Sequence, residues 1–440
     1  MTRNLLALAV CALLAVQGCE RKATMVRLAG TPAEIGRIWG ETNKRAIAHD
    51  MDVLYLKKAA AAGISEDALI ERSQAFIRIA QEIAPHWLEE ARAIARAAGV
   101  REDLYLSFVA GAVRNLFLHE CTSYSVPRQY TLDGAILFHK TRDNTPTEQA
   151  AFVLESSLPG IHKFIAICNA SRIDCCMMVN DQGLAGSADF PAHLTRKDDP
   201  NALLPEAADP QYRGIMNGHI LRHIAERAST CAQALGIIED LVKKGYDAGG
   251  KVNGTHWLFV DRRGMILEVS NNSRHVVSKF HTQKVYFSRV PTSRAAKQLR
   301  DAEQPIDFHL FHSVSRDPSI CLKDSISSMT VEIEPSHPGL LTCAWVTLPA
   351  RAGSFPLLMG QSKTPSCLLN GDAYLLGAQA KTNRPLWEAT ERSGHLSKES
   401  LKKKLLAAGA TEAADLANQW SLEQAKKLLQ LIRGRNNNVN

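Results

Sequence analysis

Apolar residues recur every three or four positions through most of the first 120 residues, which predicts a helical segment. Thr31, Pro32 and Glu34 predict the start of its first helix, because they form a threonine cap, a first-turn proline and a capping box. Gly36 and Gly40 within this helix permit close packing against a neighbour. Further helices are predicted from Ser65 to Pro85, from Leu88 to Gly99 and from Glu102 to Phe117.

After residue 120 the pattern changes to short β-favouring runs separated by turn residues, which predicts a sheet. Turns are predicted at residues 180–183 and 262–264, between pairs of such runs. Two helices are predicted within this part, at about 212–225 and 229–244. The strand-like runs lie at residues 135–139, 151–155, 163–168, 175–179, 328–334 and 340–347.

From residue 351 to residue 440 the chain returns to a helical pattern. Ser421 and Gln424 are spaced as a capping box, and an apolar stripe follows them. Ser400 and Lys403 fit an SxxK motif, but the companion motifs of β-lactamases are absent. We therefore interpret Ser400 and Lys403 as part of a solvated helix face.

The first 19 residues resemble an export signal. Arg3 supplies a positive charge, and the 12 residues from Leu5 to Val16 are apolar but too few to span a bilayer. The sequence Val-Gln-Gly-Cys that ends at Cys19 resembles the bacterial lipobox, in which the cysteine is lipidated. We expect removal of residues 1–18 and a lipid anchor at Cys19, with an ordinary signal peptide cut nearby as the alternative. By analogy with bacterial lipoproteins, Glu20 after the cysteine favours the outer membrane of a bacterial cell envelope. The chain would then face the periplasm.

The composition is that of an ordinary globular protein, with 45% apolar and 22% charged residues. The net charge of +7 is diluted over 440 residues without a basic stripe interleaved with aromatics, so nucleic-acid binding is not expected. The 10 cysteines include no CxxC pair, which argues against a cysteine zinc site. His219 and His223 could share a metal, but without an obvious third ligand we interpret them as packed or solvated histidines. We predict neither a metal nor a cofactor.

A hairpin that begins at Cys121 carries the candidate chemistry. Cys121 opens one β-favouring run, and Asp133 and Gly134 form a tight-turn signal before the next run. The hairpin returns the chain, so Lys140 and Asp143 can lie close to the cysteine. A thiol, a cation and a carboxylate brought together in this way are the parts of a nucleophilic site.

The Cys-Thr-Ser start, the strand opened by glycine and the basic residue three places before an aspartate resemble the N-terminal-nucleophile (Ntn) hydrolases. The closest likeness is to the isopenicillin N acyltransferase family of autoproteolytic cysteine acyltransferases and hydrolases. Asp261, Glu268, Ser293 and Arg294 follow in the family's order. The resemblance implies an α+β fold, the Ntn-type αββα sandwich, with a helical N-terminal pro-region at 19–120, a catalytic core at 121–350 and a helical C-terminal extension at 351–440.

The resemblance also implies the residues of the site. The precursor would cleave itself before Cys121, whose thiol becomes the nucleophile and whose new α-amine becomes the general base. Asp143 would hold this amine, and Lys140 would steady the charges of the site. Asn180 opens the family's Asn-x-x-Gly-Leu turn. Asp189 stands nine residues later, where the family carries the asparagine of the oxyanion hole.

Two positions depart from the family pattern. Asp189 can donate a hydrogen bond only when it is protonated. A second family asparagine is replaced around Val285. Backbone N–H groups or Asn180 would therefore have to carry more of the oxyanion stabilisation.

The resulting hypothesis is an autoproteolytic cysteine amidohydrolase or acyltransferase, which acts on amide bonds of an acylated small molecule or peptide through an acyl-enzyme on Cys121. One alternative is a catalytically inactive Ntn-fold envelope lipoprotein that binds a small ligand, which the changes at Asp189 and Val285 favour. Another is a thiol hydrolase of Cys-His type with a histidine such as His139 as its base. The expected partners are the amide substrate and a membrane reached through the lipid anchor, while the oligomeric state stays open.

Overall fold

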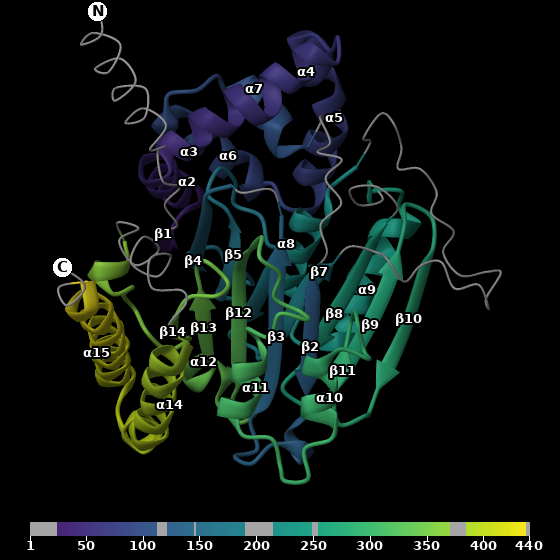
Figure 1. Ribbon diagram of the computed structural model, residues 1–440. Helices are drawn as coiled ribbons and strands as arrows, with labels where there is room; N and C mark the ends of the chain where they lie inside the picture. The colour runs from purple at the N-terminus through teal and green to yellow at the C-terminus, as the bar shows by residue number, and fades with distance from the viewer. Residues whose placement is uncertain are drawn as a thin grey trace, which may run out of the picture.

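The computed structural model describes residues 24–111, 121–144, 147–189, 214–248, 254–369 and 384–436. Two β-sheets lie face to face in the centre, and helices cover the outer face of each sheet (Figure 1). These four layers have the order helix, sheet, sheet, helix. The α+β fold class and the αββα layers expected from the sequence are therefore confirmed.

The first sheet, sheet A, has the strand order β1-β4-β5-β6-β7-β8-β9-β10. Strand β1 pairs in parallel with β4, and the other neighbouring strands pair antiparallel. Its strands are β1 (Thr24–Gly30), β4 (Gln149–Ser156), β5 (Phe164–Asn169), β6 (Met177–Asn180), β7 (Ala185–Asp189), β8 (Thr255–Val260), β9 (Ile266–Asn271) and β10 (Val276–His281).

The second sheet, sheet B, has the antiparallel strand order β11-β2-β3-β12-β13-β14. The hairpin expected after Cys121 is formed by β2 and β3, which pair with Ser123 opposite Lys140, and each of these strands has a neighbour on both sides. The strands of sheet B are β11 (Tyr286–Phe287), β2 (Thr122–Val126), β3 (Ile136–Asp143), β12 (Ser325–Ile333), β13 (Cys343–Thr347) and β14 (Ser354–Leu358).

Two of these strands correct the helical pattern expected at both ends of the chain. Strand β1 lies in the N-terminal segment and β14 lies beyond residue 350, where helices alone were expected. The reason is alternate burial along each strand. On β1, Met25 packs between the sheets and Leu28 packs under the helices of sheet A. On β14, Phe355 packs between the sheets and Leu358 packs under the helices of sheet B.

Most helices precede β2 or follow β14. In Figure 1 the N-terminal helices lie at the top of the view, and α14 and α15 lie at the left beside β14. The helices are α2 (Pro32–Thr42), α3 (Lys44–His49), the π-helix η1 (Asp50–Leu56), α4 (Lys57–Ala61), α5 (Glu66–Ile83), α6 (His86–Ala98), α7 (Glu102–Val109), α8 (Asn217–Arg227), α9 (Cys231–Lys243), α10 (Arg294–Arg300), α11 (Phe308–Val314), α12 (Pro338–Leu341), α14 (Arg384–Ala407) and α15 (Ala410–Asn436), with 3₁₀ turns η2 (Arg128–Tyr130) and η3 (Ser366–Leu368). None of the helices within the described ranges combines the length and the apolarity needed to cross a membrane.

The helix starts expected from the sequence are confirmed for α2 and α5 but not for the last helix. Thr31 and Glu34 form the capping box of α2, and Ser65 caps α5 by accepting from the backbone N–H of Ala68. Ser421 does not begin a helix, because α15 already begins at Ala410 and runs through it. The Ser421 hydroxyl instead donates to the side-chain oxygen of Gln361 at 2.7 Å, so a tertiary contact uses the group expected to cap.

Three apolar clusters hold the layers together. Between sheet A and its helices, Trp39 packs edge-on against Phe152 with ring centroids 5.5 Å apart. Between the sheets, Phe138 of β3 and Ile165 of β5 belong to one buried cluster. Between sheet B and helices α10, α11, α14 and α15, Trp345 is buried in the third cluster. Each sheet therefore buries both of its faces, which is the condition for a stable layered domain.

Candidate active site

Cys121 lies directly before strand β2, and its side chain is half-buried. Because side chains alternate along a strand, Cys121 and Ser123 share one face of sheet B. Lys140 is the direct partner of Ser123 and shares this face too. Phe138, two residues before Lys140, packs between the two sheets, so the face that carries Cys121 is turned toward sheet A.

Charges of both signs surround the Cys121 thiol. Burial raises the pKa of the thiol above its usual value, and the negative charges of Asp189 and Asp143 act in the same direction. The ammonium group of Lys140 and a backbone hydrogen bond from Asp143 act in the opposite direction. In the uncleaved chain the thiol is therefore neutral at neutral pH. A nucleophilic thiolate would need an added positive charge or a base beside it.

Lys140 of β3 and Asp189 of β7 form an ion pair that joins the two sheets, and both side chains are fully buried. The ammonium group also donates to the backbone carbonyl of Ala188 at 2.6 Å. Burial favours the neutral amine, but Asp189 and Cys121 hold the pKa of Lys140 above its usual value. Burial likewise disfavours the carboxylate, yet Lys140 and His256 hold the pKa of Asp189 below its usual value. Both partners are therefore charged at neutral pH.

Hydroxyl groups complete the surroundings of this ion pair. Ser123 Oγ donates to Asp189 Oδ1 at 3.1 Å and lies 2.7 Å from Ser187 Oγ. Ser288 Oγ accepts a hydrogen bond from the backbone N–H of Ser123 at 2.9 Å. The sequence reasoning missed Ser187 and Ser288. Side chains two residues apart on a strand share one face, so Ser187 could have been inferred from Asp189. The position of Ser288 could not, because it is set by the pairing of β11 with β2.

Asp143 is the last residue of β3 and is buried, with 4% of its surface exposed. Its carboxylate accepts a hydrogen bond from the hydroxyl of Ser325, its direct partner on β12. Its backbone amide hydrogen-bonds Cys121, as noted above. Asp143 therefore lies next to the thiol and is not a solvated loop aspartate.

Asn180 does not belong to this group of residues. It lies at the turn between β6 and β7, whereas Asp189 ends β7. Both hydrogens of its amide are donated to backbone carbonyls near the end of α8, to Ala225 at 3.0 Å and to Ala228 at 2.7 Å. Its oxygen accepts from the backbone of the turn, including Leu184 at 3.0 Å. The expected contribution of Asn180 to an oxyanion hole is wrong, because its donors are used in holding a turn to a helix.

The side chain of Val285 does not face Cys121, Ser123 and Lys140. Val285 is buried with Tyr124 and Val126 in the cluster under the helices of sheet B. Strand β11 pairs with β2 so that the following residue, Ser288, reaches Ser123 through two hydrogen bonds. Ser288, and not Val285, therefore lies beside Ser123, because the strand register determines which side chain faces it.

His139 faces away from the thiol. Along β3 it alternates with Lys140, so its ring points to the helical side of sheet B. There its Nδ1 lies 2.8 Å from Thr330 Oγ1 and its Nε2 lies 2.8 Å from Thr141 Oγ1. Burial and the nearby charges of His312 and Arg316 hold the pKa of His139 well below its usual value. The alternative of His139 as the base for Cys121 is therefore wrong for this geometry.

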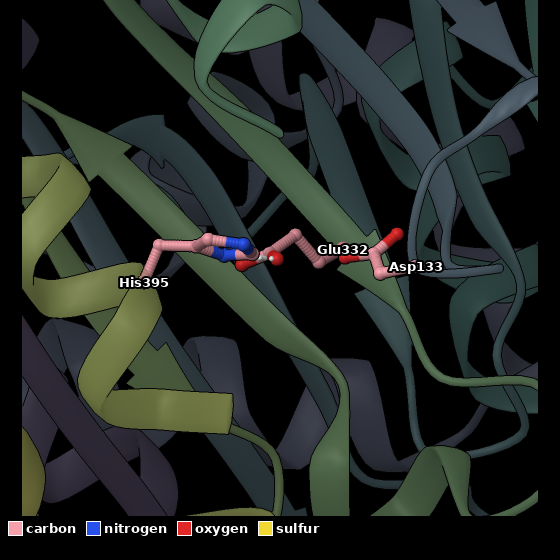
Figure 2. A group of neighbouring side chains, drawn as sticks. All are labelled: Asp133, Glu332 and His395. Atoms are coloured by element: carbon pink, nitrogen blue, oxygen red, sulfur yellow. Dashed lines mark ion pairs between the residues drawn. The ribbon is translucent and has the colours of Figure 1, made fainter. Parts of the chain in front are cut away.

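One group in the described parts of the chain has the chemistry of metal ligands, and Figure 2 shows it. The ligand atoms of Asp133, Glu332 and His395 lie within 4.8 Å of one another. Glu332 already accepts from Lys398 Nζ at 2.7 Å and from the indole N–H of Trp345 at 2.6 Å, and it pairs with His395 at 2.8 Å. A metal would have to displace the lysine and deprotonate the histidine. We therefore interpret the group as an ion-pair cluster that fastens α14 to β12.

Three other predicted features concern residues outside the described ranges. They are the leader and Cys19 at the start of the chain, and Glu120, the residue before the candidate nucleophile. Their predictions rest on the sequence alone.

No protein-family model matches the chain, and no curated protein matches it either. Solved structures do show similarity. Penicillin V acylase from Agrobacterium tumefaciens is 12% identical, with a TM-score of 0.37 over 54% of this chain and 86% of that one. An N-acylethanolamine-hydrolyzing acid amidase orthologue from Caenorhabditis elegans is 12% identical, with a TM-score of 0.34 over 50% and 94%. Conjugated bile acid hydrolase from Clostridium perfringens is 12% identical, with a TM-score of 0.36 over 54% and 92%. At this distance the activity has to be argued from the chain's own side chains.

Proposed function

We propose that the chain is an Ntn-type cysteine amidohydrolase or acyltransferase that cleaves itself before Cys121. It would act on the amide bond of an acylated small molecule or peptide. The observation that carries the proposal is the position of Cys121 directly before an interior strand of sheet B, with the Lys140 ammonium and the Asp143 backbone acting on its thiol. These are the surroundings that a nucleophilic thiol needs.

Self-processing uses the thiol of the uncleaved chain. The Cys121 sulfur attacks the carbonyl carbon of Glu120, the bond from that carbon to the Cys121 nitrogen breaks, and the thiol proton is transferred to the nitrogen. Water then hydrolyses the resulting thioester, which restores the thiol and leaves a carboxylate on Glu120. The α-amine released on Cys121 has an ordinary pKa of about 8, which suits a general base near neutral pH.

The new amine changes the electrostatics of the thiol. In the uncleaved chain, burial and two carboxylates keep the pKa of Cys121 high. Transfer of the thiol proton to the α-amine creates a positive charge on the same residue as the thiolate, which stabilises the ion pair. Asp143 would accept a hydrogen bond from this ammonium group. Cleavage would thus convert an inert thiol into a nucleophile.

The inactive, ligand-binding alternative retains one supporting observation. At the place where the resemblance predicts an amide donor, the Asp189 carboxylate is tied to Lys140 and Ser123. If no other group stabilised an oxyanion, the site would bind without turning over. The two possibilities differ in whether a new N-terminus forms at Cys121.

The experiment is mass spectrometry of the purified, folded chain. We expect one piece that ends at residue 120 and one that runs from Cys121 to the end. Cys121→Ala should remain a single polypeptide, while Cys367→Ala, the matched change at another half-buried thiol, should be cleaved like wild type. The two pieces should elute together under native conditions, because β1 pairs with β4 along 7 residues. An uncleaved wild-type chain with a cooperative melt would contradict the proposal.

We further propose that the mature chain is held to a membrane through a lipid on Cys19 and faces the periplasm. The support is the sequence alone, namely the short apolar stretch of the leader and the lipobox-like residues that end it.

A further inference from the structure

Lys140 has one hydrogen-bond donor more than its protein acceptors use. A lysine ammonium carries three N–H groups. In this structure one is donated to the carbonyl of Ala188 at 2.6 Å and one to the carboxylate of Asp189. The side chain is fully buried, so bulk water cannot accept the third hydrogen bond. The remaining donor needs an acceptor inside the site.

The Cys121 thiol lies on the same face of sheet B as Lys140, because Cys121 is two residues before Ser123 and Ser123 pairs directly with Lys140. Among the surrounding charges, Lys140 is the strongest influence that favours the thiolate over the neutral thiol. The effect is mutual, because a negative charge on Cys121 also favours the protonated form of Lys140. The ammonium and the sulfur are therefore close enough to stabilise each other's charged form.

Asp189 has a different task from the amide that the resemblance predicts at its position. Its Oδ1 atom accepts from both Lys140 and Ser123, and as an ionised carboxylate it has no hydrogen to donate. It cannot act as an oxyanion donor. Its charge instead keeps the ammonium protonated and holds it between the two sheets. His256, directly opposite Asp189 on β8, favours the ionised state of Asp189 from the other side.

We propose that the third N–H of Lys140 is the donor that stabilises the Cys121 thiolate and the oxyanion formed from it, and that Asp189 is a positioning residue for Lys140. This inference rests on the proposed function for its oxyanion part. Lys140, a buried cation, would then stabilise the oxyanion in place of the amide side chains that the resemblance predicts. A fixed charge in a water-poor site stabilises a developing anion more strongly than the same charge in water.

The reaction step balances without a further reagent. The thiolate adds to the substrate's carbonyl carbon, an S–C bond forms, and the π electrons of the carbonyl move to its oxygen, which accepts the Lys140 N–H. When the intermediate collapses, the C–N bond breaks and the leaving amine takes a proton from the α-ammonium group of Cys121. Lys140 keeps its proton throughout, as its raised pKa requires.

The first test measures the thiol itself. Alkylation of Cys121 by iodoacetamide is followed by peptide mass spectrometry between about pH 6 and pH 10, with the half-buried Cys367 in the same sample as reference. Lys140→Met should raise the apparent pKa of Cys121 by a unit or more, so that alkylation at about pH 8 falls about tenfold. Lys140→Arg, which keeps the charge, should stay near wild type. An unchanged profile in Lys140→Met would overturn the inference.

The second test uses Asp189→Asn, which introduces the amide that the resemblance predicts. If Asp189 positions Lys140, self-cleavage should slow by about tenfold or more, because the cation loses its anchor. If the position merely lacks an amide donor, the same change should accelerate cleavage, and that result would overturn the positioning role.

Two controls keep the tests interpretable. Removing one member of a buried ion pair can unfold the chain, so Lys140→Met with Asp189→Asn removes both charges together. The double variant also lacks the Asp189 charge that raises the pKa of Cys121, so its apparent pKa should lie between those of wild type and Lys140→Met. A wild-type profile in the folded double variant would overturn the inference. Alkylation needs no amide turnover. A chain that does not cleave itself but shows the Lys140 effect would therefore refute the proposed function and leave the thiolate role standing.

Discussion

At the scale of single residues, the surroundings of Cys121 are charged groups buried in pairs. Lys140 is paired with Asp189 across the sheets, and Asp143 is paired with Ser325 along sheet B. Burying such groups without partners would cost several kcal/mol each. Each of these groups has a partner in this structure, so the fold buries them without leaving an unpaired charge.

Asp143→Asn tests the acid at this scale. The amide keeps the shape and the acceptor for Ser325 but loses the charge that would hold the α-ammonium group of Cys121. We expect self-cleavage to slow by about 10²-fold, the usual scale for a positioned acid–base partner, with little change in melting temperature. Asp67→Asn, at an exposed position on α5, is the matched control. Unchanged cleavage and an unchanged melt would exclude Asp143 from the site.

At the scale of elements, close approach of α2 and α6 depends on two glycines. A Cβ at Gly36 would lie 2.7 Å from the Ala93 methyl group, and one at Gly40 would lie 2.7 Å from that of Ala97. Both distances are shorter than side-chain contacts allow. The sequence pattern indicated this close packing, and the partner helix is now identified as α6.

Gly36→Ala should therefore lower the free energy of unfolding by about 1–3 kcal/mol, because the helices must move apart. Gly236→Ala is the matched control within α9, where an added Cβ meets nothing within 4 Å. It should be neutral or stabilising by about 0.5–1 kcal/mol, the usual gain for alanine over glycine inside a helix. Denaturant unfolding of both variants checks the prediction, and equal destabilisation of the two would contradict it.

A second element-scale feature is the attachment of α14 to β12 by the Glu332 cluster (Figure 2). Burial lowers the pKa of His395, but Glu332 outweighs this effect and holds the pKa above its usual value. Protonation of His395 thus favours the folded state. This contribution is complete below the ordinary histidine pKa of about 6.5 and is lost as the pH rises through the raised folded-state pKa.

We therefore expect His395→Gln to lower the melting temperature at about pH 6 and to have a smaller effect at about pH 9. His337→Gln, at an exposed position, should give the same small difference at both pH values. Thermal melts of the three proteins at the two pH values make the comparison. A pH-independent loss in His395→Gln would show that packing on Phe308, and not charge, explains the histidine.

At the scale of the whole molecule, the described part of the N-terminal segment belongs to the sandwich. Its strand β1 joins an edge of sheet A, and its helices cover one face of that sheet. Four residues separate Cys19 from Thr24, where β1 begins. An extended chain of that length spans at most about 18 Å, so a lipid on Cys19 would keep the sandwich close to the membrane.

Labelling with a palmitate analogue tests this arrangement. Wild type should be labelled and should sediment with membranes, whereas Cys19→Ser should be unlabelled. Cys11→Ser, which changes the other cysteine of the leader region, should be labelled like wild type. Equal labelling of wild type and Cys19→Ser, or labelling of neither, would remove the anchor.

The sequence by itself determined the features that depend on neighbours along the chain. The cap at Thr31, the helix start at Ser65 and the hairpin that brings Lys140 and Asp143 back to Cys121 were predicted correctly. Each is specified within a few residues, by a turn, a cap or a periodic apolar pattern. The layer order followed from these elements together with the resemblance.

The tertiary structure alone decided the features that depend on distant partners. Residues of β1 and β14 form strands of the two sheets, and the amide of Asn180 donates to a carbonyl of helix α8. Asp189 forms an ion pair with Lys140. Strand register decided that Ser288, and not Val285, meets β2. A side chain's role in this site is set by the group opposite it on another strand, and that group lies up to 182 positions away along the chain.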